Sequence, residues 1–454
     1  MTLDNGVIRK LAQEDSKLDM DELEISTDNK GIEMKSLINE STTATADDES
    51  NETSTKEHQL GTATQGQVAV NIVISFVGAG LLGMPYAFSR SGWLLGSICI
   101  SLVSIANVYA MLLLVKCRQQ LEKQGHKDII GYGDLGRIVS GIAGERLVNI
   151  CLVISQVGFA TAYIIFIGAN LSSIWEKYYK KEIDITPYVC FGCVPILSML
   201  VQAKEMKTLS PFSLLADFSN LLGLSVVLFQ DYEEYRFHHE TIKAFDFSNL
   251  LYVCAVGIYA LEGVGLILPL ETSCQDRKAF PSLLKKVIFG ITAFMVIFGC
   301  CGYLAFGSNT RAPITLNLSV GSLANLVKLA LCLALYLTYP VMMFPVNEVM
   351  ESMVFSSEAD SRPLFRVCVV ILTAFIAYAI PDFGKFLGLV GSSICTLLGF
   401  IIPCYFHIKV FAGDLRKWEL FLDYFLMISG VIFGVLGTYN SFQELFIPED
   451  EINL

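Results

Sequence analysis

The chain has 454 residues, of which 53% are apolar and 17% are charged, and its mean hydropathy is +0.54. Soluble domains carry about 25% charged residues, so this composition excludes a water-soluble globule and indicates that most of the chain lies in lipid. The net charge of −12 resides mainly in the first 66 residues, and no basic stretch is present that would bind a nucleic acid.

Residues 1–66 form an acidic tail with 15 Asp and Glu, 6 Lys and Arg, and no aromatic residue. Such a segment buries too little apolar surface to offset its ordering entropy, so we expect it to be disordered. In the tail, Glu33 is followed after three residues by Leu37 and Ile38, a pattern read by cytosolic sorting adaptors. This pattern favours delivery to a vacuole or lysosome, with the plasma membrane as the second possibility.

Eleven hydrophobic stretches follow, each near the roughly 20 residues that cross about 30 Å of hydrocarbon. The ten-residue alternation of a membrane β-barrel is absent, so we predict an all-α domain over residues 67–440, followed by a short luminal or extracellular C-terminus, 441–454. The predicted spans are 67–88, 93–115, 147–170, 187–203, 211–230, 249–270, 287–306, 323–347, 367–381, 386–406 and 420–440.

The orientation of the spans follows from the distribution of Lys and Arg, which concentrate in cytosolic loops. With the N-terminus in the cytosol, cytosolic loops contain seventeen of these residues and the opposite loops contain eight. We therefore predict a cytosolic N-terminus. The sequon at Asn317 would then face the exoplasmic side, where it could carry a glycan.

Span one contains an unusual segment, Val77 to Pro85 (VGAGLLGMP), and span six contains a near copy, Glu262 to Pro269 (EGVGLILP). Three glycines and a proline within eight residues are unfavourable in a continuous helix. Spans one and six lie five spans apart and so cross the membrane in opposite directions. The matched pair predicts discontinuous helices in a five-plus-five inverted repeat, with span eleven as an addition.

A broken helix at membrane depth exposes N–H and C=O groups that protein, water or ligand must satisfy. The half-helix after Gly80 would direct its N–H groups and positive dipole end at the gap, which suits a carboxylate, and the preceding half-helix ends in carbonyl groups, which suit an ammonium group. Together they fit the zwitterion of an amino acid. The alternative is that these glycines only allow close helix packing.

Three polar residues within the spans are candidates for coupling to a proton or ion: Glu262, Asp217 and Thr338. Burial disfavours the charged form of a carboxyl group, so Glu262 could exchange a proton; alternatively it satisfies backbone N–H groups at the break. Asp217 could instead reach cytosolic water, and the Thr338 hydroxyl could bind a cation or donate to its own helix.

No arrangement typical of an enzyme or a metal centre is present. The five histidines show neither a nucleophile partner nor metal-ligand spacing. Cys190 and Cys193 form a C-x-x-C at the start of a hydrophobic span, where buried structural thiols are expected. We predict no enzyme activity, no metal and no cofactor beyond a coupling proton or sodium ion.

Several longer motifs resemble the amino acid/auxin permease family, and within it most closely the plant and fungal vacuolar amino-acid transporters. The resemblance covers residues 67 to about 440. The motifs are NIVISFVGAGLLGMPYAFSRSGW from Asn71, YGDLG from Tyr132, EGVGLILPLE from Glu262, GYLAFG from Gly302, LYLTYPVMMFPVNE from Leu335 and LVGSSICTLLGFIIP from Leu389.

This resemblance implies a LeuT-like fold and proton-coupled movement of small neutral amino acids by alternating access. It assigns the substrate to backbone groups at the two discontinuities. The carboxylate would lie near Gly78, Ala79, Gly80, Leu81 and Gly83, and the amine near Glu262, Gly263 and Gly265. An amino-acid sensor that signals through the acidic tail remains the alternative, because the same broken helices would serve either function.

Overall fold

The structure is a computed structural model that describes residues 61–126, 129–178, 185–203, 206–235, 242–318, 321–354 and 362–446. These residues are helical apart from their connections and one isolated β-bridge between Ala63 and Cys274. Residues 1–60 of the predicted tail, with the sorting residues Glu33, Leu37 and Ile38, lie outside the described part, as do residues 447–454. The prediction of disorder over 1–66 is wrong for residues 61–66, because Ala63 bridges Cys274 and α3 begins at Gln65.

Helices cover all eleven predicted spans. The first span consists of α3 (Gln65–Phe76), α4 (Ala79–Leu82) and α5 (Met84–Ser91), the second of α6 (Trp93–Lys123) and the third of α7 (Tyr132–Tyr178). The fourth span consists of α8 (Thr186–Gly192) and α9 (Val194–Leu200), the fifth of α10 (Met206–Tyr235), and the sixth of α11 (Leu250–Ala260) and α12 (Val264–Ser273). The remaining spans correspond to α13 (Phe280–Phe306), α14 (Ser322–Val354), α15 (Pro363–Ala379), α16 (Phe383–Val390) with α17 (Ile402–Val410), and α18 (Lys417–Phe446). Short 3-10 turns are η1 (Phe247–Asn249), η2 (Gly307–Asn309) and η3 (Ile314–Asn317).

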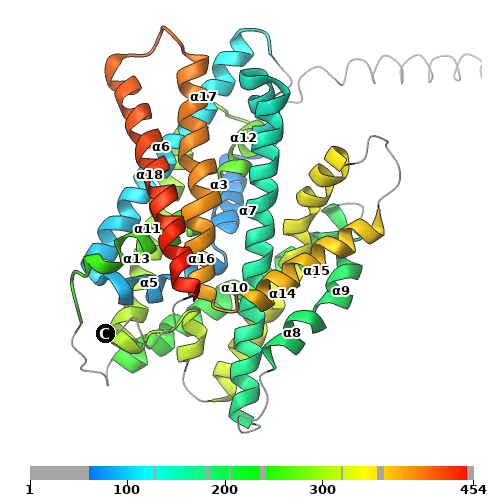
Figure 1. Cartoon of the computed structure of the whole chain (residues 1–454), viewed down its shortest axis with the longest axis vertical. Coiled ribbons are helices and arrows are strands. Elements are labelled where there is room, and N and C mark those ends of the chain that lie inside the picture. Colours follow the sequence, from blue (N-terminus) through cyan, green and yellow to red (C-terminus); the bar gives the residue numbers. More distant parts are fainter. Residues whose placement is uncertain are drawn as a thin grey trace, which may run out of the picture. The chain divides into compact units, whose positions relative to one another are not determined.

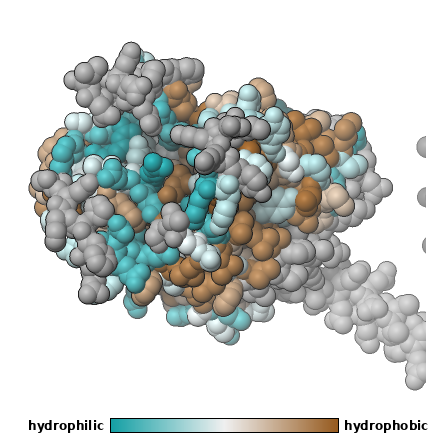
Figure 2. All heavy atoms as spheres, turned by 90° about the horizontal axis from the view of Figure 1, so that it is seen from below, coloured by the Kyte–Doolittle hydropathy of each residue, from teal (hydrophilic) through white to brown (hydrophobic). Residues whose placement is uncertain are grey.

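Seven helices within the described residues are long and apolar enough to cross a membrane. They are Trp93–Lys123, Tyr132–Tyr178, Phe247–Ser273, Phe280–Asn309, Ser322–Met353, Phe383–Val410 and Lys417–Leu445. Shorter apolar helices cover Gln65–Phe76, Thr186–Leu200 and Pro363–Ala379. Large apolar side chains on the outside, such as Leu102, Ile105 and Phe289, are 60–77% exposed, and Figure 2 shows such hydrophobic surface in brown beside a hydrophilic area. The helical unit is therefore a membrane protein, and the number of its crossings stays a prediction.

The broken helices occupy the interior of the helical unit. In Figure 1, α3 and α12 lie near α7 inside the bundle, with α16 to α18 on the left and α8, α9, α14 and α15 on the right. α12 contacts α3, α6 and α7, while α11 packs against α6 and α16. This arrangement places the interruptions of the first and sixth spans among helices from both ends of the sequence.

Two predicted spans differ in detail from the structure. α7 begins at Tyr132, fifteen residues before the predicted span, and bends at Ser140 and Gly141, where Gly141 has a φ of +69°. The tenth span contains two π-helical turns, η4 (Gly391–Cys395) and η5 (Leu397–Ile401), between α16 and α17. A Cβ on Gly391 would overlap the Ala255 carbonyl group, so the widened turn permits a close backbone approach to α11.

Candidate functional site

The first interruption separates α3 from α4. α3 ends at Phe76, and the N–H of Val77 still bonds to the Val73 carbonyl at 2.9 Å. Gly78 is extended, with φ −133° and ψ −158°, and α4 begins at Ala79 without a side-chain cap. The chain therefore breaks two residues earlier than Gly80, the point expected from the sequence. The first N–H groups of α4 have no intrahelical partner, and they are available to an anion.

The second interruption comprises Leu261, Glu262 and Gly263, between α11 and α12. Gly263 precedes α12 with an extended φ of −171°, and α12 also begins without a hydrogen bond from the side chain of its N-cap residue. The N–H of Leu261 bonds to the Gly257 carbonyl and that of Glu262 to the Tyr259 carbonyl. The carbonyl groups at the end of α11 thus lie beside the N-terminus of α12.

The two interruptions are in direct contact. A Cβ on Gly80 would lie 2.9 Å from the Cα of Ala260, which is the last residue of α11. A Cβ on Gly263 would overlap the ring of Phe76. Each break therefore places a glycine against the neighbouring half-helix. The glycines therefore allow close helix packing, which was the alternative explanation for them. A cavity is also present beside them.

The cavity has a volume of about 180 Å³, far above the roughly 10 to 15 Å³ that one water molecule needs. It is lined by Ser75, Phe76, Gly78, Ala79, Gly80, Leu152, Val153, Gln156, Phe159, Tyr163, Tyr259, Ala260, Glu262, Gly263, Gly265, Leu266, Met342, Pro345, Val346 and Val349. Both broken helices, α7 and α14 thus enclose a space large enough for a small organic solute.

Most of the predicted substrate residues line this cavity, and two do not. Gly78, Ala79, Gly80, Glu262, Gly263 and Gly265 are among its lining residues, whereas Leu81 and Gly83 are not. Leu81 is fully buried in the core, and a Cβ on Gly83 would meet the side chain of Leu387 at 2.5 Å. The geometry therefore associates Leu81 and Gly83 with packing.

Sequence reasoning missed four polar side chains in the cavity lining: Ser75, Gln156, Tyr163 and Tyr259. The Ser75 hydroxyl donates to the Asn71 carbonyl of its own helix. The side-chain oxygens of Gln156 and Tyr259 are buried and have no hydrogen-bond partner within the described residues. The Tyr163 hydroxyl lies 4.0 Å from the position of a Cβ on Gly78. Buried polar atoms are rarely left unpaired, so these oxygens are suited to hydrogen-bond a polar solute. Their only sequence signal is a polar side chain within an apolar run.

Glu262 faces both the cavity and the tenth span. Its carboxyl group interacts with the backbone N–H of Val264, at the start of α12, and its Oε2 lies 3.6 Å from the position of a Cβ on Gly399 in η5. Asn107 of α6 donates a hydrogen bond to the neighbouring Leu261 carbonyl. The contact with Val264 matches the structural alternative for Glu262, while its place in the lining leaves it within reach of a bound solute.

Of the other predicted coupling residues, Thr338 is not among the lining residues of the cavity. The Thr338 hydroxyl donates to the Ala334 carbonyl of its own helix at 2.9 Å, which is the alternative to binding a cation. Asp217 lies on α10, and its side chain is outside the described residues.

The predicted glycosylation site is only partly described. The side-chain amide of Asn317 donates to the Asn309 carbonyl and accepts from the Arg311 N–H, and Ser319 of its sequon is outside the described residues.

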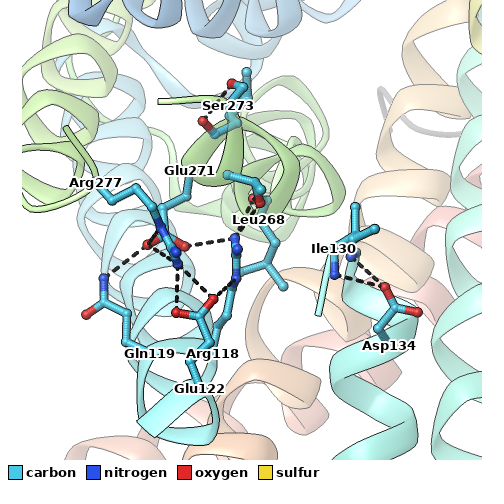
Figure 3. Close-up of polar contacts among 12 residues, drawn as sticks. Arg118, Gln119, Glu122, Ile130, Asp134, Leu268, Glu271, Ser273 and Arg277 are labelled. Atoms are coloured by element: carbon cyan, nitrogen blue, oxygen red, sulfur yellow. Dashed lines mark hydrogen bonds and ion pairs between the residues drawn. The ribbon is translucent and has the colours of Figure 1, made fainter. Parts of the chain in front are cut away.

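A buried ion cluster fixes the far end of α12 (Figure 3). Arg118 of α6 is 3% exposed and pairs with the fully buried Glu271 at 3.1 Å and with Glu122 at 3.0 Å. Arg277 pairs with the same two carboxylates at 3.3 and 2.9 Å. Beside it, the Ala63 N–H bonds to the Ser273 carbonyl. The end of α12 is thus tied to α6 and to the segment before α3.

Comparison with known proteins agrees with this arrangement. A family model described as transmembrane amino acid transporter protein matches residues 61–443. The chain is 37% identical to the amino acid transporter ANT1 of Arabidopsis thaliana, covering 83% of this chain and 91% of that protein. It is 36% identical to AVT3B of the same plant, with 83% and 92% covered. Vacuolar amino acid transporter 3 of Saccharomyces cerevisiae is 28% identical, with 82% and 55% covered.

Solved structures support the fold. The inward-facing conformation of Mhp1 superposes with a TM-score of 0.56 at 12% identity, covering 85% of this chain and 91% of that one. Mhp1 in a closed conformation, described as a nucleobase-cation-symport-1 family transporter, superposes with a TM-score of 0.50, also at 12% identity, with 85% and 93% covered. The helical unit therefore has LeuT-like structural neighbours, as the resemblance in sequence implied.

Proposed function

Because the chain belongs to the transmembrane amino acid transporter protein family, we propose that it is a secondary active transporter that moves small neutral amino acids together with protons. The observation that carries the proposal is the cavity at the meeting point of the two broken helices. Transporter sites at such discontinuities use half-helix ends to bind charged groups. An amino acid carries both charges that these ends attract.

The substrate carboxylate is proposed to accept hydrogen bonds from the N–H groups of Ala79 and Gly80, at the start of α4. The substrate ammonium group donates to the carbonyl groups at the end of α11, near Ala260. Gln156 and Tyr259 each offer a buried side-chain oxygen without a partner among the described residues to the same ligand. The remaining walls include Phe159, Leu266, Met342 and Val346, which favours a small uncharged side chain.

The proposed topology has eleven crossings, a cytosolic N-terminus and a five-plus-five inverted repeat. In this topology Leu152 of α7 and Val349 of α14, both in the cavity lining, lie toward the cytosol. On the other side of the cavity, the rings of Phe159 and Tyr259 are in edge-to-face contact, with their centroids 4.8 Å apart. The conformation is therefore proposed to be inward-facing, and transport to proceed by rocking of the first and sixth spans about the site.

Glu262 is the proposed proton carrier. Its carboxyl group lies in the cavity lining beside the break, where protonation removes a charge that burial disfavours. Proton binding and substrate binding would then share one set of half-helix ends. This shared position supports coupling by a proton, because Glu262 is a carboxyl group within the described lining that can bind and release one.

The membrane of residence is proposed to be the vacuolar or lysosomal membrane. The sorting pattern in the tail and the relative named as a vacuolar transporter support this location. An acidic lumen would supply about 1.4 kcal/mol per proton for each pH unit, which drives roughly tenfold export of an amino acid to the cytosol. We propose this direction of net transport.

Ligand binding tests the substrate class. The purified full-length protein in detergent is heated with millimolar alanine, serine, leucine, glutamate or lysine. Binding to the native state raises the midpoint of unfolding, so the neutral amino acids should raise it and the charged ones should not. Stabilisation by glutamate or lysine alone contradicts the proposed substrate class.

A further inference from the structure

A second hollow lies on the outside of the helical unit, between α3, α10 and α13, with a volume of about 670 Å³. Its floor includes Leu224 and Ile291, which are 6% and 4% exposed, whereas Phe218 and Leu221 at its edges are 65% and 67% exposed. Lipid is the solvent for such an apolar surface. The hollow thus opens toward the membrane, and none of its lining residues lines the central cavity.

Three polar residues occur in this lining of mostly apolar residues: Asn220, Ser225 and Lys286. The Ser225 hydroxyl donates to the Leu221 carbonyl of its own helix. Lys286 on α13 is exposed, and the side-chain amide of Asn220 on α10 lies in the same lining. In the proposed topology α10 and α13 cross the membrane in the same direction. Lys286 lies at the cytosolic end, immediately before the predicted span 287–306, whereas Asn220 lies near the middle of the predicted span 211–230. Phe294 lies eight residues beyond Lys286, about 12 Å deeper along the helix, close to half of the roughly 30 Å hydrocarbon thickness.

We propose that this hollow binds one anionic glycerophospholipid of the cytosolic leaflet. One acyl chain occupies the space between the three helices, and the phosphate lies beside Lys286. The leaflet assignment rests on the topology in the proposed function. A cation at the polar end and an apolar lining of about one leaflet's depth match an anionic amphiphile, and they do not match the zwitterion proposed for the central cavity.

The position of the hollow gives the lipid a connection to transport. Val73, Ile74 and Val77 contribute the α3 wall, and Val77 is the C-cap residue at the first interruption. A chain wedged between α3 and α10 would restrain movement of α3. We therefore expect the content of anionic lipid to change the transport rate without any contact between the lipid and the amino acid.

The test measures lipid binding directly by native mass spectrometry of the full-length protein, delipidated in detergent and titrated with phosphatidylserine or phosphatidylcholine. A Cβ on Gly290 in the lining meets no atom within 4 Å, so Gly290→Phe adds a large side chain to the hollow from a position where the Cβ itself has open space. Lys286→Gln removes the cation. Gly192→Phe is the matched control, because Gly192 also has open space and lies on α8, outside the hollow.

The wild type and the control should bind one phosphatidylserine about fivefold more tightly than phosphatidylcholine, since one lysine near an anionic surface contributes about 1 kcal/mol. Lys286→Gln should abolish this preference, and Gly290→Phe should weaken binding of both lipids at least tenfold. Unchanged binding to Gly290→Phe, equal affinity of the wild type for the two lipids, or displacement of phosphatidylserine by cholesterol would each overturn the proposal. No amino acid is present in this assay, so its outcome is independent of the transport proposal.

Discussion

The ring of Phe76, the last residue of α3, lies against Gly263, the residue that precedes α12. This contact joins the two broken helices at the edge of the cavity. It also explains why glycine occupies the position, because any side chain there would overlap the ring. The pair therefore offers a direct way to disturb the site and then to repair it.

Gly263→Ala should reduce amino-acid uptake at least tenfold, because overpacking at a tight contact costs about 2 kcal/mol, more than the roughly 1.4 kcal/mol of a tenfold change. The second change Phe76→Leu should restore a large part of the uptake by removing the ring. Uptake is measured in cells with radiolabelled substrate, normalised to protein in the membrane fraction. Wild-type uptake by Gly263→Ala, or no recovery in the double variant, argues against this contact.

Glu262→Gln should retain amino-acid binding and abolish accumulation against a gradient, because glutamine keeps the shape of the side chain and exchanges no proton. Binding is followed by thermal stabilisation, and accumulation by uptake at imposed pH differences. Glu145→Gln is the control, since Glu145 on α7 is partly exposed and pairs with the exposed Arg137. A pH dependence of uptake that persists in Glu262→Gln exonerates this residue.

Gln156→Leu and Tyr259→Phe should separate binding from stability. The side-chain oxygens of both residues are unpaired within the described structure, so their removal should leave the midpoint of unfolding unchanged or higher. Loss of one hydrogen bond to the substrate, about 1 to 1.5 kcal/mol, should weaken binding about tenfold. Full substrate affinity in both variants would exclude these oxygens as ligands.

Glu271→Ala should destabilise the protein by about 3 to 5 kcal/mol, because it removes the fully buried carboxylate that pairs with both Arg118 and Arg277. The double variant Arg118→Met with Glu271→Leu should recover most of the loss, since apolar residues can replace a buried pair. Lys243→Ala, which removes an exposed pair with Asp246, should have little effect. Denaturant unfolding in detergent measures all four proteins, and equal stability of Glu271→Ala and Lys243→Ala contradicts the prediction.

The sequence predicted the helices and the sites of interruption because hydrophobic length and clustered Gly and Pro are local signals. It placed the first break at Gly80 rather than at Gly78. The segment Val77–Pro85 contains three glycines, and the sequence alone does not show at which of them the helix is interrupted. The sequence assigned Leu81 and Gly83 to the substrate, whereas Leu81 is fully buried and Gly83 packs against Leu387, contacts that a sequence motif does not reveal.

Other features depend on contacts between distant segments, which a single sequence does not reveal. Arg118 and Glu271 are paired across 153 residues, and Gln156 of α7 and Tyr259 of α11 line the same cavity. The π-helical turns of the tenth span arise where Gly391 approaches the Ala255 carbonyl. None of these has a local pattern of residues that distinguishes it from ordinary apolar helix.

Proton-driven flux of an amino acid in proteoliposomes tests the central claim most directly. Purified wild-type protein and Gly263→Ala are reconstituted, a pH gradient is imposed, and the movement of labelled alanine is followed. The account predicts that the wild type accumulates alanine against its gradient, that dissipating the pH difference stops accumulation, and that Gly263→Ala moves at least tenfold less. Binding of alanine by the wild type without any net movement would contradict transport and would favour an amino-acid sensor.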